Sequence, residues 1–91
     1  MALKWTSKAH GDLVRLHEFL DSVDPLAAIR VARQLVASAK QIPFHPRLGV
    51  RLPEFNPRDV RKLLVGDYEI RYEVTTTDVF ILRIFHTRED R

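Results

Sequence analysis

The fold is decided by residues 60–86, which read VRKLLVGDYEIRYEVTTTDVFILRIFH. Three runs rich in β-branched and aromatic residues, at 60–65, 68–74 and 79–86, are separated by gaps of only two and four residues. Such short gaps are typical of hairpins. The pattern therefore predicts three consecutive antiparallel strands.

In the middle run, apolar residues alternate with charged ones. The apolar set is Tyr68, Ile70, Tyr72 and Val74. The charged set is Glu69, Arg71 and Glu73. Because successive side chains of a strand point to opposite faces, we expect one face to be core and the other to be charged and accessible.

A helical hairpin is predicted ahead of these strands. Residues 2–6 (ALKWT) suit an edge strand of the same sheet, and Ser7 can cap the helix that follows. Apolar residues then recur at helical spacing and form one stripe, namely Ala9, Leu13, Leu16, Leu20 and Val23. Asp24-Pro25 ends this helix and begins the next, because Asp24 can cap free amides and Pro25 suits the first helical position.

The second helix is expected to end before Pro43, since the residue preceding a proline is disfavoured in a helix. Its inner side is predicted to carry Ala28, Val31, Ala32, Leu35, Ala39 and Ile42. Four prolines and one glycine in residues 43–57 indicate an irregular connection. We thus predict a single α+β domain over residues 1–91: an N-terminal edge strand, an antiparallel two-helix hairpin, and a three-stranded antiparallel run that completes one sheet.

Composition indicates the compartment and the kind of partner. The 91-residue chain has no cysteine and no long apolar run, so we expect a cytoplasmic protein with no membrane association. The net charge of +3 favours an acidic partner or nucleic acid. Many of its basic residues lie in the second half: Arg47, Arg51, Arg58, Arg61, Lys62, Arg71, Arg83, Arg88 and Arg91.

The sequence contains no recognisable metal or nucleophile motif. Its histidines are His10, His17, His45 and His86, and none has the spacing of a metal site. Ser7, Ser22 and Ser38 lack the surroundings of a catalytic serine, and no glycine-rich phosphate loop is present. We therefore expect no metal and no cofactor.

Charged residues of the helices are most simply a solvated face: Asp12, Glu18, Arg30, Arg33 and Lys40. The strand cations Arg61, Arg71 and Arg83 are different, because long cations suit a strand only where the face is wet or paired. They form either cross-strand pairs, with Glu69 and Glu73 as partners, or a binding surface.

The hairpin carries more apolar residues than its inner stripes need. These are Val14, Phe19, Leu26, Ile29 and Val36. They are either the margins of the core or a groove for a partner's helix or extended segment.

The order of several short motifs resembles the RelE/ParE superfamily of bacterial type II toxins, and the ParE branch most. The motifs are Trp5-Thr6, Ala9, Asp12-Leu13, Asp24-Pro25-x-Ala27-Ala28, Val60-Arg61-x-Leu63, Tyr68-x-Ile70-x-Tyr72, and residues 81–88 with His86. The resemblance implies the fold described above. It also implies a cognate antitoxin, ParD-like or similar with an acidic amphipathic tail, in a hetero-oligomer that meets operator DNA only through the antitoxin.

The superfamily implies two activities. RelE-like members cleave messenger RNA on the ribosome, and the matching basic positions here are Arg61, Lys62, Arg71, His86 and Arg88. Their characteristic arginine, however, falls on Glu69, whose carboxylate would repel the scissile phosphate. ParE-like members stall DNA gyrase by binding, which requires a surface and no catalytic residue.

We therefore favour a gyrase inhibitor. The residues expected to bind its target are Arg61, Arg71, Arg83, His86 and Arg88. Those expected to bind the antitoxin are Val14, Ile29, Val36, Arg61 and Arg71. His86 has three open roles: a vestigial general acid, a surface contact, or a cap at the strand end. Besides the nuclease, a non-toxic module that keeps only the antitoxin interface is the other alternative.

Overall fold

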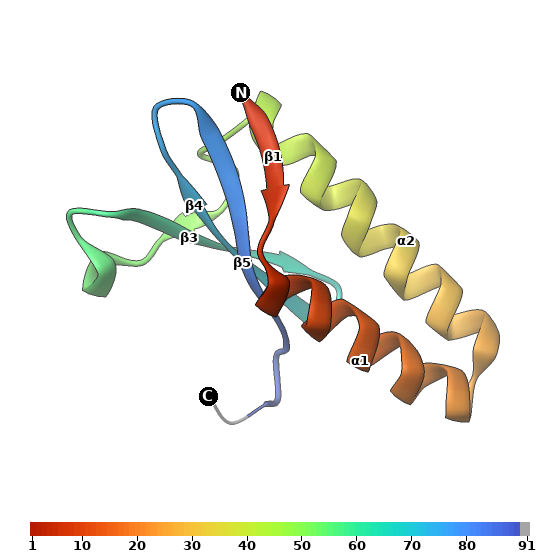
Figure 1. Ribbon diagram of the computed structural model, residues 1–91. Coiled ribbons are helices and arrows are strands. Elements are labelled where there is room, and N and C mark those ends of the chain that lie inside the picture. Colours follow the sequence, from red (N-terminus) through yellow and green to blue (C-terminus); the bar gives the residue numbers. More distant parts are fainter. Residues whose placement is uncertain (90–91) are drawn as a thin grey trace.

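A two-helix hairpin covers one face of a five-stranded sheet in the computed structural model, which describes residues 1–89 (Figure 1). In chain order the elements are β1 (Ala2–Trp5), α1 (Ser7–Val23), α2 (Pro25–Gln41), the 3₁₀ helix η1 (Ile42–Phe44), β2 (Val50–Arg51), the 3₁₀ helix η2 (Pro53–Phe55), β3 (Asp59–Val65), β4 (Tyr68–Val74) and β5 (Asp78–His86). The predicted α+β fold is confirmed. Within the described residues, no helix combines the length and apolar character needed to cross a membrane.

The strands lie in the order β1-β5-β4-β3-β2. The three predicted strands form the antiparallel run β3, β4 and β5, and β1 joins the edge of β5 in parallel, after the hairpin has crossed over the sheet. Between Arg71 and Tyr72 the register shifts, since these residues pair with Arg83 and Ile81, and Leu82 becomes the extra residue of a β-bulge. Strand β2 was not predicted, because it is only two residues long within the proline-rich connection.

Both helices begin at capping side chains. The cap of α1 is Thr6 and not, as predicted, Ser7, because Thr6 has the extended backbone of a cap residue while Ser7 is already helical. Thr6 Oγ1 accepts a hydrogen bond from the Ala9 amide at 3.1 Å and donates one to the Ile81 carbonyl at 2.8 Å. As predicted, Asp24 caps α2 by accepting from the Ala27 amide at 3.2 Å, and α2 ends just before the turn that contains Pro43.

The core lies between the hairpin and the covered face of the sheet. Its fully buried side chains include Leu35, Ile42, Ile70, Tyr72, Val79 and Ile81. The prediction that Val23 belongs to the inner stripe was wrong, since 72% of its surface is exposed. Val23 is the last residue of α1, and the tip of the hairpin extends beyond the end of the sheet (Figure 1).

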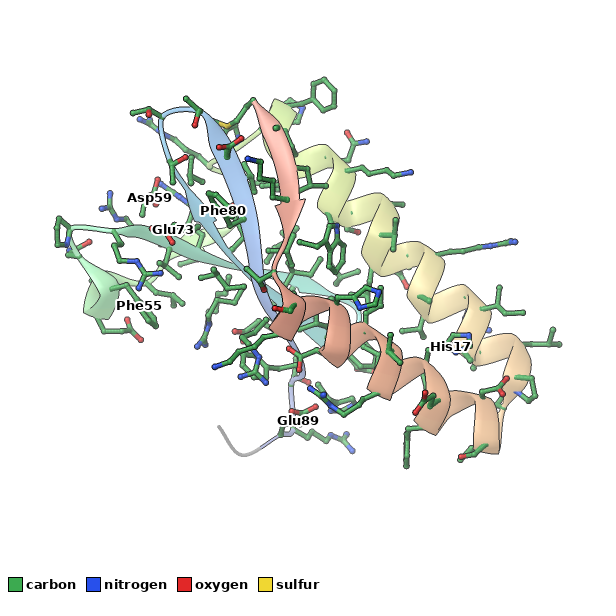
Figure 2. All side chains as sticks on the ribbon, in the orientation of Figure 1. His17, Phe55, Asp59, Glu73, Phe80 and Glu89 are labelled. Carbon is green, nitrogen blue, oxygen red and sulfur yellow. The ribbon has the colours of Figure 1, made fainter. Side chains whose placement is uncertain are left out.

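We call the sheet face away from the helices the open face; Phe55 and Glu73 lie on this side (Figure 2). The prediction that all its charges are accessible was wrong for Glu69, which is only 1% exposed. In the register Glu69 lies between Leu64 of β3 and Phe85 of β5, and Arg71 donates to its carboxylate at 3.0 Å. Large neighbours and a paired arginine thus bury a carboxylate that alternation alone places in solvent.

The loop before β2 approaches β3 and β4 closely at Gly49. The Tyr72 hydroxyl accepts from the Gly49 amide and donates to the Pro46 carbonyl, both at 2.8 Å. A β-carbon at Gly49 would stand 2.6 Å from the Lys62 carbonyl oxygen and 2.8 Å from the Tyr72 ring. Only glycine fits here without displacing backbone.

Gly49→Ala should therefore lower the free energy of unfolding by about 1–3 kcal/mol, as overpacking does in a tight interior. Gly11→Ala is the matched control. Inside α1 its new β-carbon would meet only the flexible end of Arg15, at 3.3 Å, so alanine's better helix propensity should raise stability by about 0.5–1 kcal/mol. Urea unfolding of both variants measures whether the two changes in the free energy of unfolding have opposite signs. An unchanged free energy of unfolding in Gly49→Ala would contradict this account of the loop.

Candidate functional site

Three cations lie directly opposite one another across the open face. Lys62 of β3 pairs in register with Arg71 of β4, and Arg71 pairs with Arg83 of β5. Like charges opposite each other destabilise a sheet. We call Lys62, Arg71 and Arg83 the basic row, and its existence requires compensating anions nearby.

Arg71, the centre of the basic row, is partly enclosed. Its guanidinium lies 5.2 Å from the ring centroid of Phe85 and 5.8 Å from that of Phe55, and it pairs with Glu69. Its Nε atom is buried and has no hydrogen-bond partner among residues 1–89. The side chain is thus held by aromatic contacts and by a carboxylate of its own strand. The pairing alternative expected cross-strand pairs with Glu69 and Glu73, but Glu73 pairs with Arg58.

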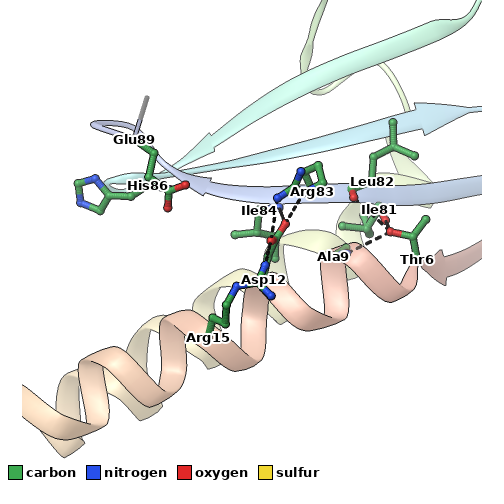
Figure 3. A network of polar contacts seen from close by, with 10 residues as sticks. All are labelled: Thr6, Ala9, Asp12, Arg15, Ile81, Leu82, Arg83, Ile84, His86 and Glu89. Carbon is green, nitrogen blue, oxygen red and sulfur yellow. Dashed lines mark hydrogen bonds and ion pairs between the residues drawn. The ribbon is translucent and has the colours of Figure 1, made fainter. Parts of the chain in front are cut away.

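Arg83 is compensated by Asp12 of α1 (Figure 3). Asp12 accepts from Arg83 Nε at 2.8 Å and Nη2 at 3.1 Å, from the Ile84 amide at 2.9 Å, and from Arg15. Strand β1 pairs with β5 only as far as Ile81, so the Ile84 amide has no strand partner on that edge and the carboxylate takes its place.

The prediction that Asp12 lies on a solvated face was wrong, since it is only 6% exposed. The signal was available in the sequence: Asp12 stands three residues after Ala9 and four before Leu16, which places it beside the inner stripe. Burial by itself would raise the pKa of Asp12. The hydrogen bonds from Arg83 and Ile84, with the charges of Arg83 and Arg15, outweigh it and hold the pKa below its ordinary value.

Arg61 is not part of the basic row. It pairs in register with Tyr72 and therefore points to the helix-covered side of the sheet. There it donates to Asp59 at 2.9 Å and to the Gly49 carbonyl at 3.0 Å, with 13% of its side chain exposed. Of the cations predicted to bind the target, the structure thus brings Arg71 and Arg83 together and separates Arg61 from them.

His86 and Arg88 lie at the end of β5. His86 pairs in register with Tyr68 on the helix-covered side, and the two rings meet edge to face at 5.1 Å. His86 Nδ1 accepts from the Arg88 amide at 3.1 Å, and the His86 amide donates to Glu89 Oε1 at 3.1 Å. These bonds close the turn after the strand, which fits the capping role among the three considered.

The hairpin has two shallow apolar hollows on its surface. One, of about 290 Å³, is lined by Leu13, Val14, His17, Glu18 and Ala32. The other, of about 380 Å³, is lined by Ala32, Arg33, Val36, Ala37 and Lys40. Ala32 lines both, so the two hollows adjoin. Val14 and Val36, predicted to bind the antitoxin, therefore lie in neighbouring hollows, while the predicted Ile29 lines neither and is 45% exposed.

Comparison with known proteins decides the family. A family model described as ParE toxin of type II toxin-antitoxin system, parDE, matches residues 3–91. The chain belongs to this family of toxins. It is 35% identical over 82 residues to Toxin RelE2 of Caulobacter vibrioides, covering 90% of each chain. Its fold also matches the solved structure titled Chromosomal ParDE TA system from P. aeruginosa, with a TM-score of 0.80 and 27% identity over 94% of this chain and 95% of that one.

In this ParE-family toxin the residues of the nuclease alternative do not gather at one point. Lys62 and Arg71 lie on the open face, whereas Arg61 and His86 lie on the helix-covered side, and Arg88 lies in the turn beyond β5. No group of three potential metal ligands occurs among residues 1–89. His86 instead lines a pocket with Arg15 and Arg83. The geometry therefore does not place His86 beside Lys62 and Arg71, the two cations of the nuclease alternative on the open face.

The Asp12 network should make stability depend on pH. Asp12→Asn keeps the shape but removes the charge, and should lower the free energy of unfolding by about 1–3 kcal/mol near neutral pH. Because the folded pKa of Asp12 is lowered, its contribution is complete above the ordinary carboxyl pKa and is lost as the pH falls through the lowered value. The difference in the free energy of unfolding between wild type and Asp12→Asn should therefore become smaller as the pH falls.

Urea unfolding at neutral and acidic pH measures that difference. Asp21→Asn, an exposed change on the same helix, is the control and should shift stability by less than about 0.5 kcal/mol at either pH. If Asp12→Asn behaves like Asp21→Asn, the network does not stabilise the fold.

Proposed function

We propose that this ParE-family toxin inhibits DNA gyrase by binding, without cleaving nucleic acid, and that an antitoxin neutralises it by covering the helical hairpin. The observation that carries the first part is the buried carboxylate of Glu69, at the position where the resemblance implies an arginine in the nucleases. The proposed site of action is the cytoplasm.

Phosphoryl transfer needs cations that stabilise the extra negative charge of the transition state. Arg71 is already paired with Glu69, and Arg83 is already paired with Asp12. His86, the only histidine of the nuclease alternative, points to the other side of the sheet from Arg71. These placements oppose turnover at Arg71, while a charged surface suffices for a protein that works by binding.

The test is inhibition of supercoiling by the host's own gyrase, with cleaved DNA measured in parallel. Arg83 is unsuitable for mutation, because its loss would leave Asp12 unpaired. Lys62, which has no carboxylate within 4.0 Å among residues 1–89, and the exposed Arg88 are better choices. The double variant Lys62→Ala/Arg88→Ala should need about tenfold more protein for half-inhibition, equivalent to about 1.4 kcal/mol of binding.

Lys8→Ala/Arg30→Ala changes the charge equally on exposed helix positions and should inhibit like the wild type. Normal supercoiling at a large excess of folded wild-type protein would contradict the proposal. Codon-phased cuts in ribosome-bound messenger RNA that vanish in Arg88→Ala would instead establish the nuclease. A chain that leaves growth unaffected on induction would be the non-toxic module.

For the antitoxin, we propose a ParD-like partner whose acidic amphipathic tail lies in the two hairpin hollows. Val14 and Val36 would receive its apolar side chains, and Arg33 and Lys40 beside Val36 would attract its carboxylates. We assign the steering to this pair because Arg61 is largely buried with its own carboxylate. Operator DNA would be met through the antitoxin in the resulting hetero-oligomer.

The two halves of this interface should respond differently to mutation. Val36→Asp would force a charge into a dry contact and should speed dissociation, with a loss of about 2 kcal/mol. Arg33→Ala should mainly slow association and reduce its salt dependence. Surface-plasmon kinetics with the antitoxin from the neighbouring reading frame, at two salt concentrations, measure both. Val23→Asp, at the exposed hairpin tip outside the hollows, should change neither rate, and unchanged dissociation in Val36→Asp would exclude the hollow.

A further inference from the structure

A pocket of about 440 Å³ lies between α1 and the ends of β4 and β5, beside the part of α1 that extends beyond the sheet. Its apolar walls include Leu16 and Phe19 of α1 and Ile84 of β5. Its polar lining consists of Asp12, Arg15, Tyr68, Arg83, His86 and Glu89. Figure 3 shows its polar side, with Asp12 and Arg15 on the helix and Arg83 and Glu89 from β5 and the following turn.

The polar side of this pocket has more unused donors than acceptors. The Asp12 carboxylate already accepts four hydrogen bonds, and Glu89 already accepts one from the His86 amide. Arg15 uses only Nη2 within residues 1–89, and Arg83 leaves Nη1 unused. Since 68% of the Arg15 side chain and 38% of the Arg83 side chain are exposed, these N–H groups can meet a ligand that accepts hydrogen bonds.

Tyr68 adds a further donor. Burial, together with the charges of Asp67 and Glu89, raises the pKa of its hydroxyl, so the group stays protonated at neutral pH. Phe19, one helical turn after Arg15 on α1, is 69% exposed, which is unusual for a large apolar residue in the wall of a pocket. The pocket is thus suited to a ligand in which a hydrogen-bond acceptor lies next to an apolar group.

The charges of the pocket favour an acceptor of low charge. The charges of Arg15 and Arg83 are formally balanced by those of Asp12 and Glu89, so attraction comes from individual charge-assisted hydrogen bonds and not from a net charge. A phosphate dianion would meet twice the repulsion from Glu89 that a carboxylate would meet. A carboxylate can take charge-assisted hydrogen bonds from the two guanidiniums while carrying half that charge. A peptide supplies this carboxylate and an apolar side chain within one short segment.

We propose that this pocket binds an acidic peptide segment of a protein partner. A carboxylate of the segment accepts from Arg15 and Arg83, and a neighbouring large apolar side chain packs on Phe19 and Leu16. The pocket shares none of its α1 residues with the two hairpin hollows, so its occupant is additional to the contacts assigned above. The proposal does not depend on gyrase being the target.

The experiment titrates the full-length ¹⁵N-labelled toxin with the probe acetyl-ELFE-amide and, in parallel, with acetyl-QLFQ-amide. The acidic probe should change the NMR chemical shift of the Ile84 backbone amide. It should also bind about fivefold more tightly than the uncharged QLFQ peptide, which cannot accept a charge-assisted hydrogen bond through a carboxylate. Arg15→Gln and Phe19→Ala should each weaken the acidic probe about three- to tenfold. Both side chains are largely exposed, so the fold tolerates their replacement.

Arg30→Gln and Val23→Ala are the matched controls, since they make comparable changes at exposed hairpin positions outside the pocket, and they should bind the probe like the wild type. The proposal would be overturned if the two peptides bound with equal affinity. It would also be overturned if the affinity of the acidic probe were unchanged in Arg15→Gln and Phe19→Ala. Inorganic phosphate that shifts the same amide and displaces the peptide would overturn it as well, because the pocket would then be a general anion site.

Discussion

The hydrogen bond between the Asp12 carboxylate and the Ile84 amide joins the two layers of this protein where the sheet would otherwise have an open edge. Strand β1 ends too early to cover this part of β5, and a helix cannot supply backbone partners to a strand. A short acidic side chain on the inner side of α1 can. The same carboxylate holds Arg83, so the placement of the hairpin and the charge of the open face depend on one residue.

This arrangement explains how three cations can lie side by side on one sheet. Asp12 and Glu69 each approach one arginine of the basic row closely, and Phe85 lies near the guanidiniums of both Arg71 and Arg83. The compensation stabilises the sheet, but it also reduces the positive charge available to a phosphate. This compensation supports the binding role that we propose for the basic row.

The hairpin, in contrast to the charged open face, exposes apolar side chains. Its distal half extends past the sheet, and Phe19, Val23 and Leu26 are each more than two-thirds exposed. The hairpin also carries the two apolar hollows on one side, and on another side of α1 the pocket beside Tyr68 and Ile84 is open. Toxins of this family occur in toxin-antitoxin systems, and a chain with unsatisfied apolar surface on two sides of one helix is suited to more than one contact.

Local patterns in the sequence determined the elements themselves. Alternation and short gaps specified β3, β4 and β5, Asp24-Pro25 specified the hairpin turn, and Pro43 specified the end of α2, because each acts through backbone geometry within a few residues. Only the tertiary structure decided which charges are buried. Alternation places Glu69 on the charged face of its strand, and its burial depends on Arg71 and Phe85, which lie beside it on the sheet. Asp12 stands beside the inner stripe of α1, but the sequence does not show that Arg83 and the Ile84 amide, both on β5, supply its partners. Arg61 and Arg71 likewise look equivalent in sequence, but the register places them on opposite faces, since the identity of a face is set by what packs against it.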